Sequence, residues 1–186
     1  MTNTRLITLL ALSAGLLFST SGCKKSDPTP ADENELITTV RLKFTEGSNS
    51  QTFEWKDIDG DGGKAPVIQN IALKTNKTYK VDVSFLDESK MPIFDITEEV
   101  AKEKDEHLVI ITPAPASLFV YTYGDKDSRN FPVGLTGTAK TSGAGTGTLK
   151  VVLRHQPPIN GKPVKDGTAT LGSSDADVLF NLAVTN

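Results

Sequence analysis

Residues 78–87 read TYKVDVSFLD, and apolar side chains occupy every second position from Tyr79 onward. Tyr79, Val81, Val83 and Phe85 share one face of an extended chain, while the residues between them are polar or charged. Successive side chains of a β-strand point to opposite faces of the sheet. The pattern is therefore typical of a strand in an antiparallel sheet that covers a core on one side and meets water on the other.

Three other stretches show nearly the same alternation. They are residues 36–45 (LITTVRLKFT), 148–155 (TLKVVLRH) and 177–185 (DVLFNLAVT). In the first of them, Leu36 and Phe44 mark the two ends of the face that we expect to point inward. Together the stretches predict strands that contribute to one shared core.

Weaker alternation marks further candidate strands. They are QTFEW (51–55), VIQNIAL (67–73), HLVIIT (107–112), SLFVYTY (117–123) and VGLTGTAKT (133–141). Segments rich in glycine, proline, asparagine and aspartate separate the candidates, and such residues favour turns. Many short strands at this spacing predict an all-β fold, an immunoglobulin-like antiparallel β-sandwich that forms a single domain over residues 35–186.

The segment DITEEVAKEKDEH departs from the alternating pattern. Asp95 is followed three residues later by Glu98, as in a helix-capping box, and Ile96 and Val100 fall on one helical face. We expect one short helix over residues 96–104 that connects two strands.

The first residues of the chain have the organisation of a secretory signal peptide. Arg5 precedes a short apolar run from Leu6 to Phe18, and small residues then lead to Cys23. The run is shorter than the ~20 residues that a comfortable membrane span needs. The order resembles a lipoprotein signal peptide over residues 1–22, and it predicts lipidation of Cys23 after cleavage. The alternative is an ordinary signal peptide followed by an incidental cysteine.

Residues 23–34 (CKKSDPTPADEN) have no apolar periodicity and many charges, so we expect a flexible tether. Cys23 is the only cysteine, which rules out an internal disulfide. A lipid on Cys23 would anchor the protein to a membrane without spanning it. The formal net charge of −3 and the lack of clustered lysine and arginine argue against a nucleic-acid partner.

The segment DIDGDG (57–62) raises the question of a calcium loop. Asp57, Asp59 and Asp61 alternate as in the first half of an EF-hand, which holds calcium through carboxylate oxygens. Ile68 stands where the loop should supply a bidentate glutamate, so an EF-hand is excluded.

A second acidic segment, GDKDSRN (124–130), carries Asp125 and Asp127. The two acidic loops can lie at one end of a sandwich and contribute to a calcium site there. The alternative is that the aspartates only form turns, because aspartate and glycine are favoured turn residues.

His107 and His155 are the only histidines, and both stand at ends of candidate strands. Imidazole is a common ligand of zinc and copper, and carboxylates can complete such a site. If the two strand ends are neighbours, the histidines converge with Asp105 or Glu106. The alternative is that each histidine hydrogen-bonds a nearby carboxylate or the backbone.

No catalytic motif is recognisable in the sequence. A G-x-S-x-G elbow is absent, and GAGTG (143–147) lies between candidate strands and opens no helix, which favours a β-turn over a nucleotide-binding loop. We therefore expect a protein that is not an enzyme.

Several segments together resemble a family of small, largely uncharacterised lipoproteins of Bacteroidota. They are ENELITTV, DIDGDGGKAP, LDES, DITEEV, YGDKDS, LRHQP and the closing strand, and the resemblance covers nearly all of the mature chain. Some members carry the label "type 1 periplasmic binding fold superfamily protein". That label implies a doubly wound α/β sheet, whereas the alternation here predicts strands almost throughout. The resemblance also implies a lipid anchor in the outer membrane, at its periplasmic face or at the cell surface. It further implies an accessory role beside an outer-membrane transporter.

These observations leave three functional hypotheses. The first is a non-catalytic lipoprotein of the cell envelope that presents its end loops to a ligand or to an outer-membrane partner. The second is a lipoprotein that captures Ca²⁺ or Zn²⁺ and feeds an importer. The third is a purely structural envelope lipoprotein.

Overall fold

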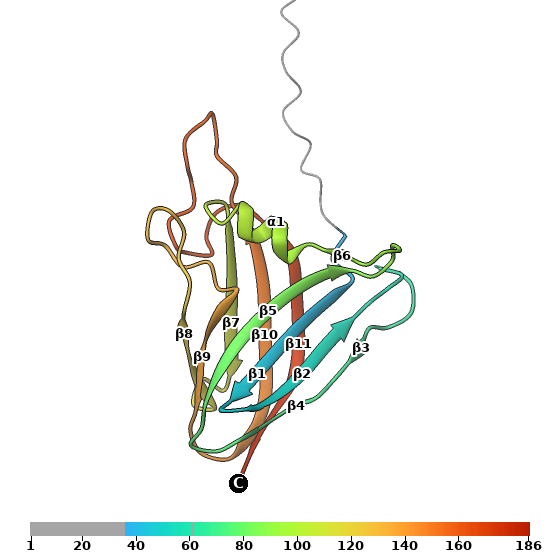
Figure 1. Ribbon diagram of the computed structural model, residues 1–186, viewed down its shortest axis with the longest axis vertical. Coiled ribbons are helices and arrows are strands. Elements are labelled where there is room, and N and C mark those ends of the chain that lie inside the picture. The colour runs from blue at the N-terminus through green and yellow to red at the C-terminus, as the bar shows by residue number, and fades with distance from the viewer. Residues whose placement is uncertain (1–35, 61) are drawn as a thin grey trace, which may run out of the picture. The chain divides into compact units, whose positions relative to one another are not determined.

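The computed structural model describes residues 36–60 and 62–186, which lie in the compact unit Asn34–Asn186. These residues form eleven strands and one helix (Figure 1). The strands are β1 (Thr39–Glu46), β2 (Asn49–Lys56), β3 (Val67–Ile68), β4 (Ile71–Lys74), β5 (Thr78–Asp87), β6 (Phe94–Asp95), β7 (His107–Ala114), β8 (Phe119–Tyr123), β9 (Thr136–Thr141), β10 (Gly145–His155) and β11 (Ser173–Thr185), and the helix is α1 (Thr97–Lys102).

The strands form two sheets. One sheet has the order β3-β2-β1-β5-β9-β8, with β6 paired to the end of β5. The other has the order β4-β11-β10-β7. Every described strand pair is antiparallel except β4 and β11, which run parallel. The predicted all-β sandwich with one short helix is confirmed, and the antiparallel arrangement has this single exception.

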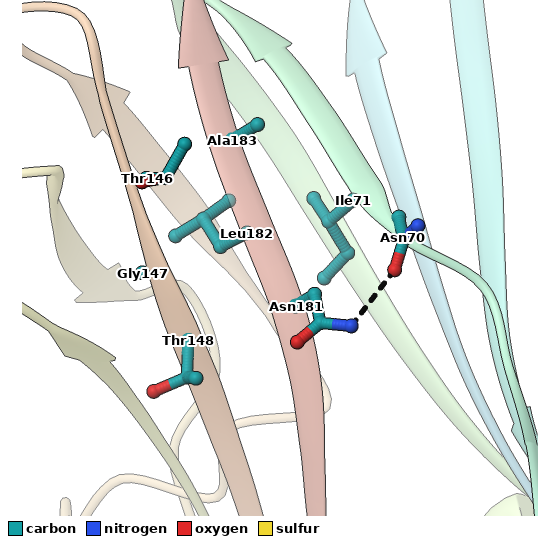
Figure 2. A pocket seen from close by; sticks show the side chains of 8 residues that line it. All are labelled: Asn70, Ile71, Thr146, Gly147, Thr148, Asn181, Leu182 and Ala183. Atoms are coloured by element: carbon teal, nitrogen blue, oxygen red, sulfur yellow. Dashed lines mark hydrogen bonds between the residues drawn. The ribbon is translucent and has the colours of Figure 1, made fainter.

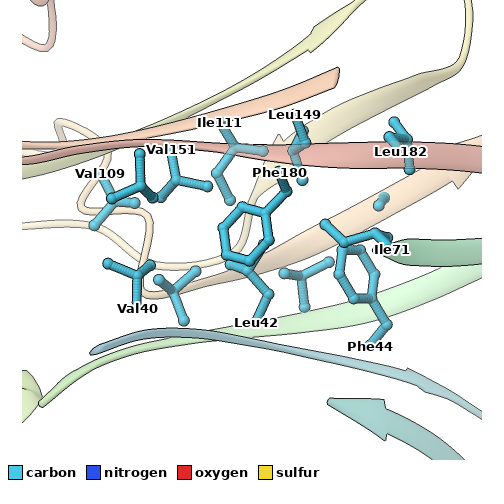
Figure 3. Close-up of a cluster of buried hydrophobic side chains, with 14 of the residues drawn as sticks. Val40, Leu42, Phe44, Ile71, Val109, Ile111, Leu149, Val151, Phe180 and Leu182 are labelled. Atoms are coloured by element: carbon cyan, nitrogen blue, oxygen red, sulfur yellow. The ribbon is translucent and has the colours of Figure 1, made fainter. Parts of the chain in front are cut away.

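The facing sides of the two sheets bury the core (Figure 3). Alternate residues of β1, β5, β10 and β11 point inward, as their sequence patterns predict. The inward residues are Val40, Leu42, Phe44, Tyr79, Val81, Val83, Phe85, Leu149, Val151, Leu153, Val178, Phe180, Leu182 and Val184. Leu36 does not join them, because β1 begins only at Thr39 and the Leu36 side chain is 49% exposed.

The segment 67–73, expected as one strand, is divided between the sheets. Its first part is β3, which pairs with β2, whereas β4 pairs with β11 in the other sheet. Between them, the Gln69 amide N–H donates to the Glu54 carbonyl (2.9 Å), and the Gln69 side-chain oxygen accepts from the Glu54 N–H (3.0 Å). Asn70 then accepts from the Asn181 side chain (2.9 Å). Two adjacent polar residues, Gln69 and Asn70, interrupt the alternation at this crossing, and both are exposed.

The helix begins one residue later than a capping box on Asp95 requires. Ile96 already has helical backbone angles and occupies the cap position, and no side chain caps it. Asp95 accepts a hydrogen bond from the N–H of Thr97, only two residues on (3.0 Å). The Thr97 hydroxyl bonds Phe85 of β5, so a contact with the sheet determines where the helix starts.

The segment GAGTG (143–147) forms a turn only in its first half, because β10 already begins at Gly145. Gly147 lies within the strand, and a Cβ added there would collide with the carbonyl oxygen of Ala114 on β7. Glycine at this position allows the two backbones to approach closely.

Replacement of Phe180 by alanine should lower the free energy of unfolding by about 3–5 kcal/mol, because the ring is fully buried between the sheets. Leu179→Ala provides a matched control, since the Leu179 side chain is 50% exposed on the opposite face of the same strand. Urea unfolding monitored by circular dichroism measures both variants. Similar losses in the two variants would contradict the assigned faces of β11.

Candidate metal centre

The two histidines face each other across neighbouring strands at the end of the sandwich that carries α1. In the pairing of β7 with β10, His107 lies directly opposite His155. Their rings stack, with centroids 4.6 Å apart and planes inclined by 7°. The ends of β7 and β10 are therefore neighbours, which is the condition under which the sequence predicted that the two histidines converge.

Three carboxylates surround the stacked rings. One oxygen of Glu103 and one ring nitrogen of each histidine lie within 4.8 Å of one another. Asp175 Oδ2 is 3.7 Å from His107 Nε2, and Glu106 Oε2 is 3.8 Å from His155 Nε2. We call these five residues the histidine–carboxylate cluster.

Asp105, the other acid considered from the sequence, turns away from the cluster. Its carboxylate accepts hydrogen bonds from the N–H (2.8 Å) and the hydroxyl (2.7 Å) of Ser128. Sequence reasoning missed Glu103 and Asp175. Glu103 stands four residues before His107, a helical spacing that could have indicated it. Asp175 is the residue of β11 left unpaired at the shift in its register with β10, which no local signal predicts.

Burial determines the charge of the cluster. Burial, together with the nearby His155 and Lys165, lowers the pKa of the His107 imidazole to about 4, although a hydrogen bond to the carbonyl of Glu103 acts in the opposite direction. Burial and the neighbouring Glu103 raise the pKa of Glu106, against the attraction of His155. His107 is therefore neutral at physiological pH, which is the form that binds a metal ion.

The donor set fits a transition metal. Zinc is held by imidazole nitrogens at about 2.0–2.1 Å and by carboxylate oxygens in tetrahedral sites. Two nitrogens of such a site are about 3.3 Å apart, so the rings must tilt to bring their ligand atoms closer. His107 Nδ1 lies 3.2 Å from the carbonyl oxygen of Glu103, and a carbonyl bonded to one ring nitrogen orients the ring and leaves the other nitrogen for a metal.

A buried ion pair lies beside the cluster. Lys165 Nζ is 3.1 Å from Asp127 Oδ2 and donates to the carbonyl of Lys104 (2.7 Å), and both charged side chains are fully buried. Although burial alone raises the pKa of Asp127, hydrogen bonds from Lys165, Phe131 and Arg129 hold that pKa below its usual range. The pair joins the loop after β8 to the loop after β10, close to the turn that precedes His107.

The aspartates of the second acidic loop are engaged by protein donors. Asp125 accepts from the N–H groups of Gly134 (2.7 Å) and Thr136 (3.1 Å). Asp127 accepts from two backbone N–H groups in addition to Lys165. These hydrogen bonds are expected if the aspartates only form a turn. They leave few carboxylate oxygens free to bind calcium.

Two aspartates of the first acidic loop also accept hydrogen bonds from backbone N–H groups. Asp57 accepts from the N–H of Gly60 (3.1 Å), and Asp59 accepts from that of Lys64 (2.9 Å). Asp61 lies outside the described residues. Both acidic loops follow strands at the same end of the first sheet, but β1, β5 and β9 lie between β2 and β8. At about 4.8 Å per strand the loops are about 19 Å apart, too far to share one ion.

A separate hollow of about 490 Å³ lies over β4, β11 and β10 (Figure 2). It is lined by Asn70, Ile71, Thr146, Gly147, Thr148, Asn181, Leu182 and Ala183. Its lining contains no histidine and no carboxylate. The hollow therefore offers neither metal ligands nor acid–base groups.

No protein-family model, curated protein or solved structure matches the chain. The resemblance to Bacteroidota lipoproteins stays a prediction. Lipidation of Cys23 also stays a prediction, because Cys23 lies outside the described residues. Within residues 36–60 and 62–186, no helix has the length and apolar character needed to cross a membrane.

Lowering the pH from 7 to 5 should destabilise the fold through His107. The unfolded chain binds a proton at the ordinary histidine pKa, whereas folded His107 resists protonation until about pH 4, so its contribution is complete above pH 6.5 and is lost below it. The expected loss between pH 7 and pH 5 is about 2 kcal/mol.

The variant His107→Gln isolates this contribution. Glu103, Glu106, Asp175, His155 and Lys165 also face the ring, and the raised pKa of Glu106 acts in the opposite direction. Urea unfolding at both pH values should show a smaller loss in the variant than in the wild type. Equal losses would mean that His107 is not the group that titrates.

Substitution Lys165→Met should destabilise the fold by about 3–5 kcal/mol, because it leaves the Asp127 carboxylate charged and buried without its partner. Adding Asp127→Asn should recover at least about half of that loss, since an amide oxygen still accepts from the loop N–H groups. A double-mutant cycle by thermal or urea unfolding measures the coupling. Additive losses would show that the two side chains do not act as a pair.

Proposed function

We propose that this protein is a non-catalytic lipoprotein of the cell envelope that binds a transition-metal ion, with zinc as the first candidate, at the histidine–carboxylate cluster. One observation carries the proposal: the two histidines of the chain, 48 positions apart in the sequence by their numbers, lie stacked on adjacent strands with a glutamate oxygen within 4.8 Å. Two imidazoles and a carboxylate make a typical transition-metal donor set.

The same observation favours a transition metal over calcium. Calcium takes six to eight oxygen ligands and has little preference for imidazole. The aspartates of both acidic loops, by contrast, accept hydrogen bonds from their own loops. Between calcium and zinc, the two metals in the functional hypotheses, zinc is therefore the better supported.

The burial of the ligands suits capture and release. His107 is 5% exposed, His155 is partly buried, and Glu103 is exposed at the end of α1. A metal ion can approach from the side of Glu103 and reach His107 last. A lipid on Cys23 would hold this site near the outer membrane, where the protein would pass the ion to a transporter. A transporter of this kind is the partner protein that the family resemblance implies.

Zinc should raise the melting temperature of the wild-type protein, and His107→Ala and His155→Ala should each abolish most of that rise. Loss of one of three ligands typically weakens a site by at least about tenfold, so isothermal titration should show a corresponding loss of affinity. Glu103→Gln should weaken zinc binding as well, because it removes a ligand oxygen. The fold should stay unchanged, because Glu103 is exposed.

The control is the pair Asp59→Asn and Asp61→Asn in the first acidic loop. These changes should leave zinc binding intact. If calcium, and not zinc, shifts the melting temperature, and the pair removes that shift, the metal site lies in the acidic loop and the proposal is wrong. If neither ion binds, the histidines form only a structural stack.

A further inference from the structure

The domain exposes its apolar side chains unevenly. Six of them gather near the start of the described chain and on two segments beside it, the loop after β2 with β3 and the loop after β5 with β6: Leu36, Ile58, Val67, Met91, Ile93 and Phe94. Their exposed fractions range from 42% for Ile58 to 91% for Met91. We call this set the apolar rim. Exposed apolar residues that occur singly need no explanation, whereas a contiguous group marks an interaction surface.

Polar contacts join the three segments of the apolar rim. The N–H of Asp57 donates to the carbonyl of Thr38 (2.8 Å), and the N–H of Glu88 donates to the Thr38 hydroxyl (2.7 Å). Lys56 Nζ lies 2.7 Å from Glu88 Oε2. The loop after β2, the chain before β1 and the loop after β5 are therefore held as one surface, at the upper right of Figure 1.

Ion pairs engage two lysines that stand beside the apolar rim. Lys56 also lies 3.6 Å from Glu54, and Lys90 Nζ lies 2.8 Å from Asp87 Oδ2. Lys90 stands 5.8 Å from the ring centroid of Phe94. Lysines beside exposed apolar groups are typical of proteins at a membrane interface, where the ammonium reaches toward headgroups while the stem stays among apolar groups.

A shallow hollow of about 370 Å³ opens within the apolar rim. It is lined by Lys56, Asp57, Ile58, Asp59, Lys64, Ala65 and Val67. Two ammonium groups therefore lie beside apolar side chains, while Asp57 and Asp59 direct carboxylate oxygens to N–H groups of their own loop. A zwitterionic phospholipid headgroup, with its phosphate and adjoining acyl region, matches this mixture.

The described chain begins at the apolar rim, where the expected tether would join it. Leu36 belongs to the rim and is also the first described residue after the expected tether. A tether of residues 23–34 spans at most about 40 Å, so a lipid on Cys23 keeps the rim near the bilayer. A lipid anchor alone binds reversibly, and stable membrane association takes a second contribution.

We propose that the apolar rim docks on the surface of the bilayer that holds the lipid anchor, with Met91, Ile93 and Phe94 inserted among the headgroups. This inference rests on the membrane anchoring in the proposed function, but not on metal binding. Because Lys56 and Lys90 beside the rim are paired with carboxylates, docking should depend on apolar insertion and only weakly on anionic lipid or on salt.

The test places a tryptophan on the apolar rim and measures how close it lies to lipid. The mature chain, residues 23–186, is coupled through its single cysteine to a maleimide phospholipid in vesicles of phosphatidylcholine and phosphatidylethanolamine. This coupling anchors the protein through Cys23 and does not depend on which lipid the cell attaches to that residue. Trp55→Phe removes the only tryptophan, and Met91→Trp or Leu179→Trp then adds one back. Leu179 is the matched control because it is exposed on the outer face of β11.

Brominated phospholipids should quench the Met91→Trp variant at least about threefold more than the Leu179→Trp variant, because rim insertion places the side chain at the headgroup boundary. Adding Ile93→Ser and Phe94→Ser should reduce that quenching. Equal, weak quenching of both variants would overturn the proposal and would leave the rim as a surface for a protein. Zinc titration of the same tethered protein reports on the metal site separately, so either result leaves the proposed metal function to be judged on its own.

Discussion

The register of β10 between its two neighbours is the constraint on which both the core and the candidate site depend. The strand pairs with β7 on one side and with β11 on the other. Its inward residues Leu149, Val151 and Leu153 are buried at 0–1% exposure. A slip of one residue would turn these side chains to the solvent, and burial of such a face specifies register strongly. The same register places His155 opposite His107.

A break in that register also shapes the site. The pairing of β10 with β11 shifts between Leu153 and Arg154. Bulges of this kind redirect side chains and are frequent beside functional sites. Beyond the shift, His155 lies opposite Ser173, two residues before Asp175. The irregularity thus falls where the core ends and the polar cluster begins.

The end of the sandwich that carries α1 is unusually rich in buried polar groups. His107, Asp127, Gln156 and Lys165 are all at most 6% exposed. The Gln156 side chain donates to the carbonyls of Thr168 and Leu171 (both 2.9 Å), which ties the long loop before β11 to the end of β10. Because buried polar groups are costly when unpaired, this network permits few arrangements of the loops and holds the candidate ligands in place.

Much of the fold could be predicted from period-two alternation, because each sheet has one apolar face and one polar face. The crossing at Gln69 and Asn70 was missed, because two adjacent polar residues do not show whether the chain stays in one sheet or passes to the other. The sequence already singled out the two histidines as candidates, but their contact depends on strand pairing. Asp175 could not be found at all, because it reaches the cluster through a partner strand rather than through a local motif.

The helix α1 links the two proposed surfaces. It follows Phe94 of the apolar rim after two residues, and it ends one residue before Glu103 of the histidine–carboxylate cluster. The Thr97 hydroxyl bonds the backbone of Phe85, so the start of the helix is attached to the strand that leads into the rim. A domain that rests on a bilayer through this rim would hold the cluster near the membrane. There the exposed Glu103 would be the first ligand that an ion meets and the last that it leaves, which suits transfer to a membrane-embedded partner.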